Sequence, residues 1–280
     1  MKKRNLVLSV MATCLVSCFL LSGCNGQKQI DSETVKTVKV EEQAHLQDDT
    51  VSPTCQITID YSYLAKSDAA DSIVQRINRT IQAHILGKEY TRMNPEVAVD
   101  SFKNTYINNY RKDVNEFYQE DIKNGTPKDE LPTWYNYEYG LTTHFSEGKE
   151  GILNFIAETF EYTGGAHPNS WNKWMNFEKN TGKLLALKDV FMAGSEKPIS
   201  DMLLEELITE MATRLEDSSI TSLEGLQNAG ILNSTNMYVP DNFLLEKEKV
   251  SFLYNKYDIA PYAVGIITLS LPYTSVEIGR

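Results

Sequence analysis

Histidine and serine side chains are the first candidates for chemistry in this sequence. Its four histidines, His45, His84, His144 and His167, lie in separate segments. None has another His or Cys at the spacing of a metal site, and no HExxH pattern is present. The sequence therefore predicts no metal and no cofactor.

Two serines have the lysine spacing of penicillin-binding enzymes. Ser146 and Ser170 are each followed by a lysine three positions later. Such a serine acts from a buried helix start, whereas Ser146 lies in an expected turn and Ser170 at an expected strand entry. GxSxG and Walker patterns are also absent. We therefore predict no catalytic residue and a protein that is not an enzyme.

The run from Tyr162 to Asn169, with the sequence YTGGAHPN, is the remaining candidate site. Adjacent glycines adopt positive φ angles with little strain, and Pro168 holds the preceding residue extended. The candidate binding residues are Gly164, Gly165, Ala166, His167 and Asn169. Because His167 has no chemical partner in the sequence, we favour a backbone-shaped corner over direct ligand contact for the two glycines.

The N-terminus has the pattern of a bacterial lipoprotein signal. Three cations precede an apolar stretch, and Leu21-Ser22-Gly23 stands directly before Cys24. Cys18 also fits this pattern but leaves apolar residues at the mature terminus, and an uncleaved transmembrane anchor is the alternative. We predict a signal peptide at 1–23, lipidation of Cys24 and a polar tether at 24–33.

Charge and cysteine content narrow the class of partner. Cleavage after residue 23 removes three cations and no acid, so the net charge changes from −11 to −14. Such acidity disfavours nucleic acid and anionic lipid and favours basic partners, although it can also serve solubility alone. Cys55, in an alternating run, is expected to be a buried apolar residue rather than a reactive thiol.

Apolar periodicity divides the chain into strands and helices. Alternation predicts strands from 55 to 63, 134 to 145 and 152 to 162. Apolar stripes predict one helix from about 68 to 86 and a second from Pro95 to 123, with Phe102, Tyr106, Tyr110, Val114 and Phe117 facing the core. We assign these elements to an N-terminal α+β domain at 34–170.

The second half repeats this mixture. Strands are expected at 171–178, 183–187, 237–245, 250–254 and 264–271. A helix from about Ser200 carries the stripe Leu204, Ile208, Met211 and Leu215, and a short helix spans 222–228. The sequence thus predicts an α+β fold with two helices packed on antiparallel sheet in the first half and one long helix in a second domain at 171–280.

An ordered set of short motifs resembles the RsiV-like extracytoplasmic domains, a pair of domains of unknown function. The first half is also similar to the accessory domain of PdaC-type peptidoglycan deacetylases. The motifs, spread over roughly residues 35–275, are Ile77-Asn78, Tyr162 to His167, Asn180 to Lys183, Leu187 to Phe191, Phe252 to Tyr257, Ile259 to Gly265 and Leu271 to Tyr273.

The resemblance implies an α+β fold and, in the RsiV branch, an envelope sensor that binds lysozyme. Because a lipoprotein signal opens the chain, we expect neither a sigma-factor-binding segment nor a deacetylase domain. Our hypothesis is a lipid-anchored, extracytoplasmic binding or sensing module for a basic protein such as lysozyme or for peptidoglycan fragments. The alternatives are a cell-wall glycan-acting enzyme with His167 as acid or base, and a structural envelope lipoprotein.

Overall fold

The computed structural model describes residues 35–47, 49–65, 71–232, 236–276 and 279. The signal peptide, Cys24 and the tether lie outside the described residues. Among the helices that are described, none is long and apolar enough to cross a membrane.

Five strands form the first sheet, in the order β1-β2-β3-β4-β5. They are β1 (Val35–His45), β2 (Thr54–Leu64), β3 (Tyr137–Glu147), β4 (Ile152–Tyr162) and β5 (Asn169–Glu178). Neighbours pair antiparallel except β2 and β3, which are parallel. A parallel pair needs a long crossover, and the two helices between these strands provide it.

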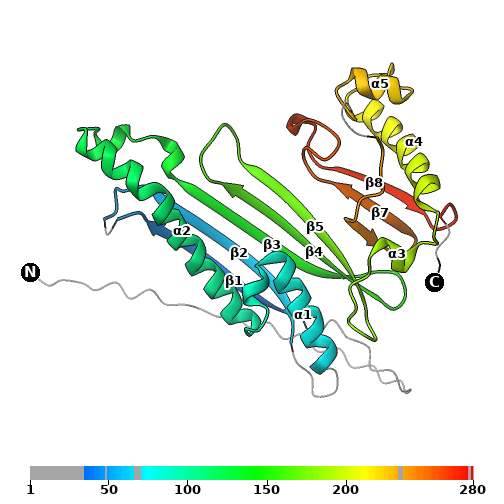
Figure 1. Ribbon diagram of the computed structural model, residues 1–280, viewed down its shortest axis with the longest axis horizontal. Helices are drawn as coiled ribbons and strands as arrows, with labels where there is room; N and C mark the ends of the chain where they lie inside the picture. Colours follow the sequence, from blue (N-terminus) through cyan, green and yellow to red (C-terminus); the bar gives the residue numbers. More distant parts are fainter. Residues whose placement is uncertain (1–34, 48, 66–70, 233–235, 277–278, 280) are drawn as a thin grey trace, which may run out of the picture.

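Helices α1 (Asp71–Ile85) and α2 (Pro95–Lys123) cover one face of this sheet (Figure 1). Asn94 caps α2 through Glu96 N–H, at 3.0 Å, with Pro95 in the first turn. Tyr110 and Val114 are buried as expected, but Phe117 is 52% exposed and Tyr118 is buried instead. At 3.6 residues per turn, the position after Val114 on the buried face is four residues on, not three.

Short 3-10 turns flank these helices and the second sheet. They are η2 (Lys88–Tyr90), η3 (Lys128–Glu130), η4 (Thr133–Tyr135) and η5 (Tyr262–Val264).

The second sheet has three antiparallel strands, in the order β6-β7-β8. They are β6 (Phe243–Leu245), β7 (Lys249–Tyr254) and β8 (Ile267–Pro272), accompanied by helices α3 (Leu187–Val190), α4 (Glu196–Arg214) and α5 (Leu223–Asn228). Helix α4 packs against β8. Strand β6 is shorter than the run expected from residue 237, since it starts only at Phe243. The expected α+β class, with two helices on the first half and one long helix on the second, is confirmed.

Two hydrophobic cores correspond to the two sheets. The first core includes Cys55, which is fully buried, and burial raises the pKa of its thiol to about 12. It also includes Met175 and Phe177 of β5. The first sheet and its core therefore continue past residue 170, where the sequence placed the boundary, because β5 pairs with β4 along Asn169 to Glu178.

Asparagine side chains join the outer edge of β5 to the second sheet. Asn176, 1% exposed, donates to Phe243 O at 2.9 Å and accepts from Leu245 N–H at 2.7 Å. Asn242 accepts from Trp174 N–H at 2.7 Å. These side-chain amides take the place of the backbone hydrogen bonds that a neighbouring strand would make, and they pair the polar backbone groups at the edge of β5. The two sheets are therefore held together by specific polar contacts.

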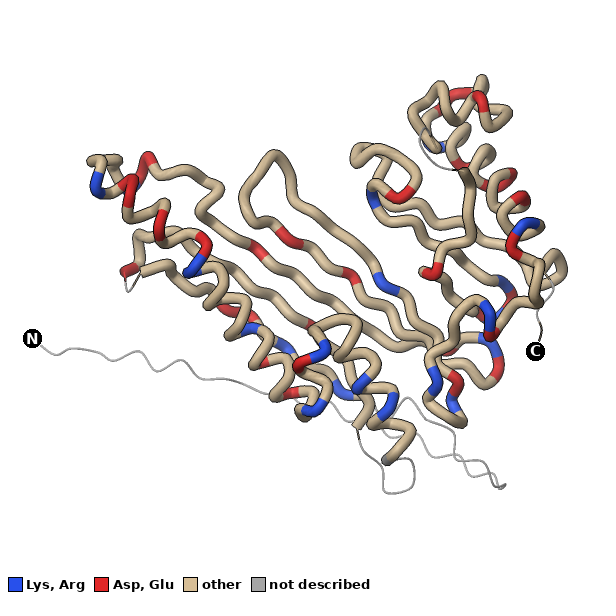
Figure 2. The backbone as a smooth tube through the Cα atoms, in the orientation of Figure 1, with Lys and Arg blue, Asp and Glu red and all other residues tan. Residues whose placement is uncertain are grey.

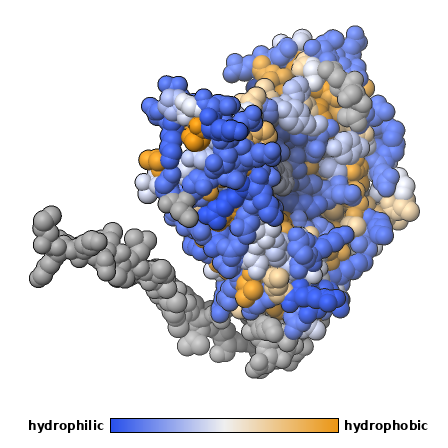
Figure 3. Space-filling model, turned by 60° about the vertical axis from the view of Figure 1, so that its left-hand side comes forward, coloured by the Kyte–Doolittle hydropathy of each residue, from blue (hydrophilic) through white to orange (hydrophobic). Residues whose placement is uncertain are grey.

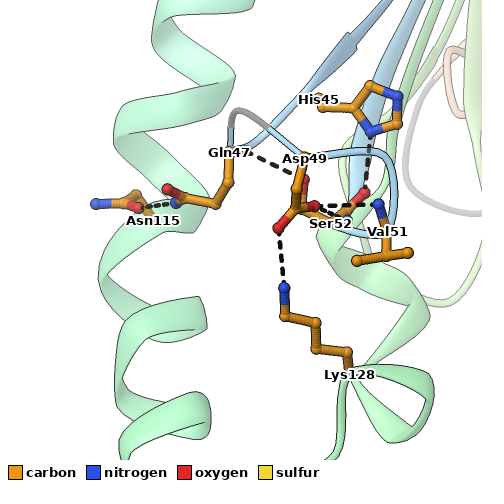
Figure 4. Close-up of polar contacts among 7 residues, drawn as sticks. All are labelled: His45, Gln47, Asp49, Val51, Ser52, Asn115 and Lys128. Carbon is orange, nitrogen blue, oxygen red and sulfur yellow. Dashed lines mark hydrogen bonds and ion pairs between the residues drawn. The ribbon is translucent and has the colours of Figure 1, made fainter.

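The β1–β2 connection is tied to α2 and η3 by polar side chains (Figure 4). Asp49 accepts from Lys128 Nζ at 2.8 Å, and its other oxygen accepts from the N–H groups of Val51 and Ser52. Gln47 donates to Asn115 on α2 at 2.7 Å. These contacts hold the pKa of Asp49 well below its usual range, first through Lys128 and then through the two backbone donors.

We expect an Asp49→Asn variant to lose part of the acid sensitivity of folding. A carboxyl whose folded pKa is depressed stabilises the protein above its unfolded pKa of about 4, and this contribution is lost as the pH falls below that value. The melting temperature of the parent protein should therefore fall more between pH 5 and pH 3 than that of Asp49→Asn. The exposed Asp113 provides the control: Asp113→Asn should keep the parent's pH dependence, and equal slopes for Asp49→Asn and the parent would contradict the prediction.

Candidate functional site

The candidate residues of the YTGGAHPN run form the tip of the β4–β5 hairpin, at residues 163–168. Gly164 has a φ of +80° and Gly165 a φ of +120°, in the region that favours glycine. Tyr162 Oη donates to Gly165 O at 3.2 Å, which closes the turn. Ala166, His167 and Asn169 are exposed. The tip is therefore a turn whose backbone requires glycine at positions 164 and 165.

The tip lies between two segments that are far away in the sequence (Figure 1). On one side Gly164 contacts Trp134 of η4 so closely that a Cβ atom would stand 2.9 Å from Trp134 Cβ and O. On the other side the His167 ring stacks on Tyr262 of η5, with centroids 3.8 Å apart and an interplanar angle of 22°. Two motifs that the sequence showed separately are thus in direct contact.

Three rings form what we call the aromatic platform: His167, Tyr257 and Tyr262. Tyr257 Oη lies 3.2 Å from His167 Nε2, and the rings of Tyr257 and Tyr262 are 5.9 Å apart. Lys256 Nζ lies 4.2 Å above the Tyr262 ring, within cation–π range. Tyr257 is 61% exposed and has a φ of +70°, unusual for a residue that is not glycine. Residues other than glycine that are held at such φ angles cluster at functional sites, which makes Tyr257 a candidate for contact with a ligand or partner.

Both nitrogens of His167 are occupied. Nδ1 lies 3.1 Å from Pro168 O, which only accepts, so Nδ1 carries the proton and Nε2 accepts from Tyr257 Oη. Tyr262 Oη also donates to Pro168 O, at 2.9 Å. These bonds fix the orientation of the rings, and the histidine acts here as an aromatic and polar surface element.

A recess of about 340 Å³ adjoins the platform, where the edge of β5 meets the second sheet. Its lining includes Trp171, Asn172 and Tyr238, together with Asp258. Asn255 accepts from Asn172 N–H at 2.7 Å and so places the segment that carries Tyr257. Burial, and then the charge of Asp258, raises the pKa of Tyr238. This mixture of aromatic, amide and acidic groups extends the surface beyond the three rings.

The face of the molecule that Figure 3 shows is mostly hydrophilic, with apolar residues scattered among polar ones. Within the described part of the chain, no group of three or more His, Cys, Asp or Glu residues has an arrangement that could hold a metal ion. His45 Nδ1 lies 3.3 Å from Ser52 O and His84 Nδ1 lies 3.0 Å from Thr80 O, and His84 also lines the recess beside the platform.

Tyr257, Tyr262 and Lys256 were not among the residues predicted for the site. Periodicity shows which face of an element is apolar but not which distant segment lies beside it. One feature of the sequence could have pointed to Tyr262. The TGGAH run at 163–167 and the APYA run at 260–263 belong to the same set of motifs.

Two protein-family models match consecutive parts of the chain. The Deacetylase PdaC family model matches residues 50–170, and that of the Protein of unknown function (DUF3298) family matches residues 188–274. No curated protein matches the chain.

Two crystal structures are similar over nearly the whole chain. A DUF3298 family member from Bacteroides fragilis is 29% identical, with a TM-score of 0.80 over 90% of this chain and 96% of that one. A DUF3298 family protein from Pseudomonas aeruginosa is 16% identical, with a TM-score of 0.55 over 88% and 97%, which shows a shared fold alone. The paired-domain resemblance is thus confirmed: the chain contains a region that matches the PdaC family model, followed by a region that matches the DUF3298 family model.

Proposed function

We propose that this protein is a lipid-anchored binding or sensing module of the bacterial cell envelope, whose aromatic platform contacts a basic protein. One observation carries the proposal: segments about ninety residues apart build a hydrogen-bonded cluster of three rings at the surface, in which His167 stacks on the half-buried Tyr262 and Tyr257 is exposed. Exposed aromatic residues that are held rigidly contribute much binding energy in interfaces at little cost in side-chain entropy.

The position of the platform suits a module held at its N-terminus. Strand β1 starts at Val35, which pairs with Leu64 at one end of the first sheet. Tyr162, which leads into the platform, pairs with Glu138 at the opposite end. Lipidation of Cys24, eleven positions before Val35, would place the first end near the membrane and the platform away from it.

Net charge favours a basic partner. A mature chain with a charge of −14 attracts cationic proteins over long range, and this attraction is screened as salt rises. Lysozyme is the partner that the RsiV resemblance implies. The hydrogen bonds of His167 hold its ring in place on this surface, which suits a residue that contacts a partner.

The proposal is tested by measuring lysozyme binding to the purified protein at low and high salt. We expect binding that weakens steeply with salt, and a loss of roughly tenfold or more in affinity for Tyr257→Ala, the size of an interface hot spot. Met192 is 53% exposed in the DUF3298 domain and provides a control, since Met192→Ala should leave affinity unchanged.

Three results would count against this function. If lysozyme failed to bind at both the low and the high salt concentration, lysozyme would be excluded as the partner. Equal affinities for Tyr257→Ala and Met192→Ala would exclude the platform as its contact. Changed muropeptide profiles on incubation with the protein, abolished by His167→Ala, would favour the glycan-acting enzyme.

A further inference from the structure

A pocket of about 510 Å³ opens at the other end of the first sheet. Its floor includes Leu64 and Val74, both 1% exposed, together with the buried amides of Asn78 and Gln82. Asn78 holds both backbone groups of Leu64, at 3.0 and 2.8 Å, and Gln82 Nε2 donates to two carbonyls. The floor is therefore rigid, and the volume is in the range of pockets that bind small ligands.

Three cations from three elements line the rim of this pocket. Lys36 comes from β1, Arg79 from α1 and Arg92 from the segment before α2. Among the residues that the structure describes, none of the three forms an ion pair with a carboxylate, although Arg79 donates to Gln75 at 3.3 Å. Uncompensated cations around one pocket are unexpected in a chain with a net charge of −11.

One carboxylate also lines the pocket, and it is already engaged. Glu96 accepts from Tyr63 Oη at 2.5 Å. Burial, and then this bond, raises the pKa of Tyr63 to about 12, so the tyrosine stays a donor to Glu96. With Glu96 counted, the three cations leave the pocket with a charge of +2.

We propose that this pocket binds the phosphate group of a small phosphomonoester or of a lipid headgroup. A phosphomonoester carries about −1.5 to −2 charges at pH 7, close to the opposite of the pocket's charge, whereas a single carboxylate carries only one. Arginine guanidinium groups also match phosphate oxygens in paired hydrogen bonds. The surrounding apolar residues, among them Met93 and Pro95, would contact the organic part of the ligand.

This site is separate from the aromatic platform. Lys36 pairs with Tyr63 near the start of β1, at the sheet end opposite Tyr162. Figure 2 shows Lys and Arg gathered along the lower edge of the molecule, around α1. The net negative charge of the protein repels anions mainly over long distances, where salt screens the repulsion. The attraction between the pocket's cations and a bound phosphate is screened much less. The pocket therefore does not depend on the proposed partner of the platform.

The test is calorimetric titration of the mature protein, in neutral detergent micelles, with glycerol 3-phosphate. We expect saturable binding that weakens from pH 8 to pH 5, as the phosphate gains a proton with its second pKa near 6. The double variant Arg79→Gln/Arg92→Gln should weaken binding by tenfold or more for each lost charged hydrogen bond, by the usual energies of such bonds. The matched double variant Lys39→Gln/Lys88→Gln removes the same charge from exposed positions outside the pocket and should bind like the parent.

A second arm identifies the source of the phosphate. Micelles doped with phosphatidic acid should raise the melting temperature of the parent but not of Arg79→Gln/Arg92→Gln if the ligand is a lipid headgroup. A response to the soluble ester alone assigns a soluble ligand. No binding of either probe, equal binding of glycerate, or equal losses in both double variants would overturn the proposal.

Discussion

Replacing Asn176 with alanine is expected to lower the free energy of unfolding by about 2–6 kcal/mol, since each of two buried polar groups left without a partner costs about 1–3 kcal/mol. The variant leaves two backbone groups of β6 without a hydrogen-bond partner, the N–H of Leu245 and the carbonyl of Phe243. Asn176 is 1% exposed, so water cannot replace the amide without opening the junction between the sheets. Equilibrium denaturation with urea measures the change.

Two variants control this experiment. Asn169→Ala makes the same replacement at the exposed start of β5 and should change stability by less than about 0.5 kcal/mol. Asn176→Asp keeps an acceptor for Leu245 N–H but loses the donor to Phe243 O, so it should remain clearly destabilised. A loss below about 1 kcal/mol for Asn176→Ala would show that the asparagine contacts do not hold the two sheets together.

Local patterns in the sequence were sufficient for the class of fold. Alternation located β2, β3 and β4, and the stripes located α1 and α2, because each element buries one face and therefore repeats with its own period. Helix α4 forms where a helix was expected, but of the predicted stripe only Met211 is buried and Leu215 is 40% exposed. The same patterns do not specify strand order. The parallel pairing of β2 with β3 follows from the crossover of α1 and α2, which no short window of sequence contains.

The junction and the candidate site were harder to predict for a physical reason. No pattern in the sequence identified the junction asparagines. Their side chains nevertheless bond the edge of β5 to the second sheet, at Asn172, Asn176, Asn242 and Asn255. The glycine-rich run was recognised as a corner because positive φ favours glycine, which is a local property. Its neighbour Tyr262 could not be identified, because stacking on His167 depends on how the second domain docks.

Gly164→Ala is the second large effect we expect, with a loss of about 1–3 kcal/mol in stability, the usual range for a side chain forced into a disfavoured backbone region. The φ of +80° is one cause, and contact with Trp134 is the other, since the new Cβ would lie 2.9 Å from Trp134 Cβ and from its carbonyl oxygen. Both atoms belong to or adjoin the backbone of η4, so relief requires a shift of the whole turn. Thermal denaturation gives the size of the loss.

Two other glycines separate the contribution of the backbone from that of the contact. Gly125 has a φ of +87°, and a methyl group at this position would have no other atom within 4 Å. Gly125→Ala therefore reports the cost of φ alone and should be milder than Gly164→Ala. Gly165→Val should likewise reduce stability through its φ of +120°, before it affects any ligand.

The outcomes of this comparison decide what the tip of the hairpin does. If Gly164→Ala and Gly125→Ala lost the same stability, the contact with Trp134 would have no energetic role. If Gly165→Val kept its melting temperature but lost lysozyme binding, the tip would be a direct contact and not only a corner that positions His167.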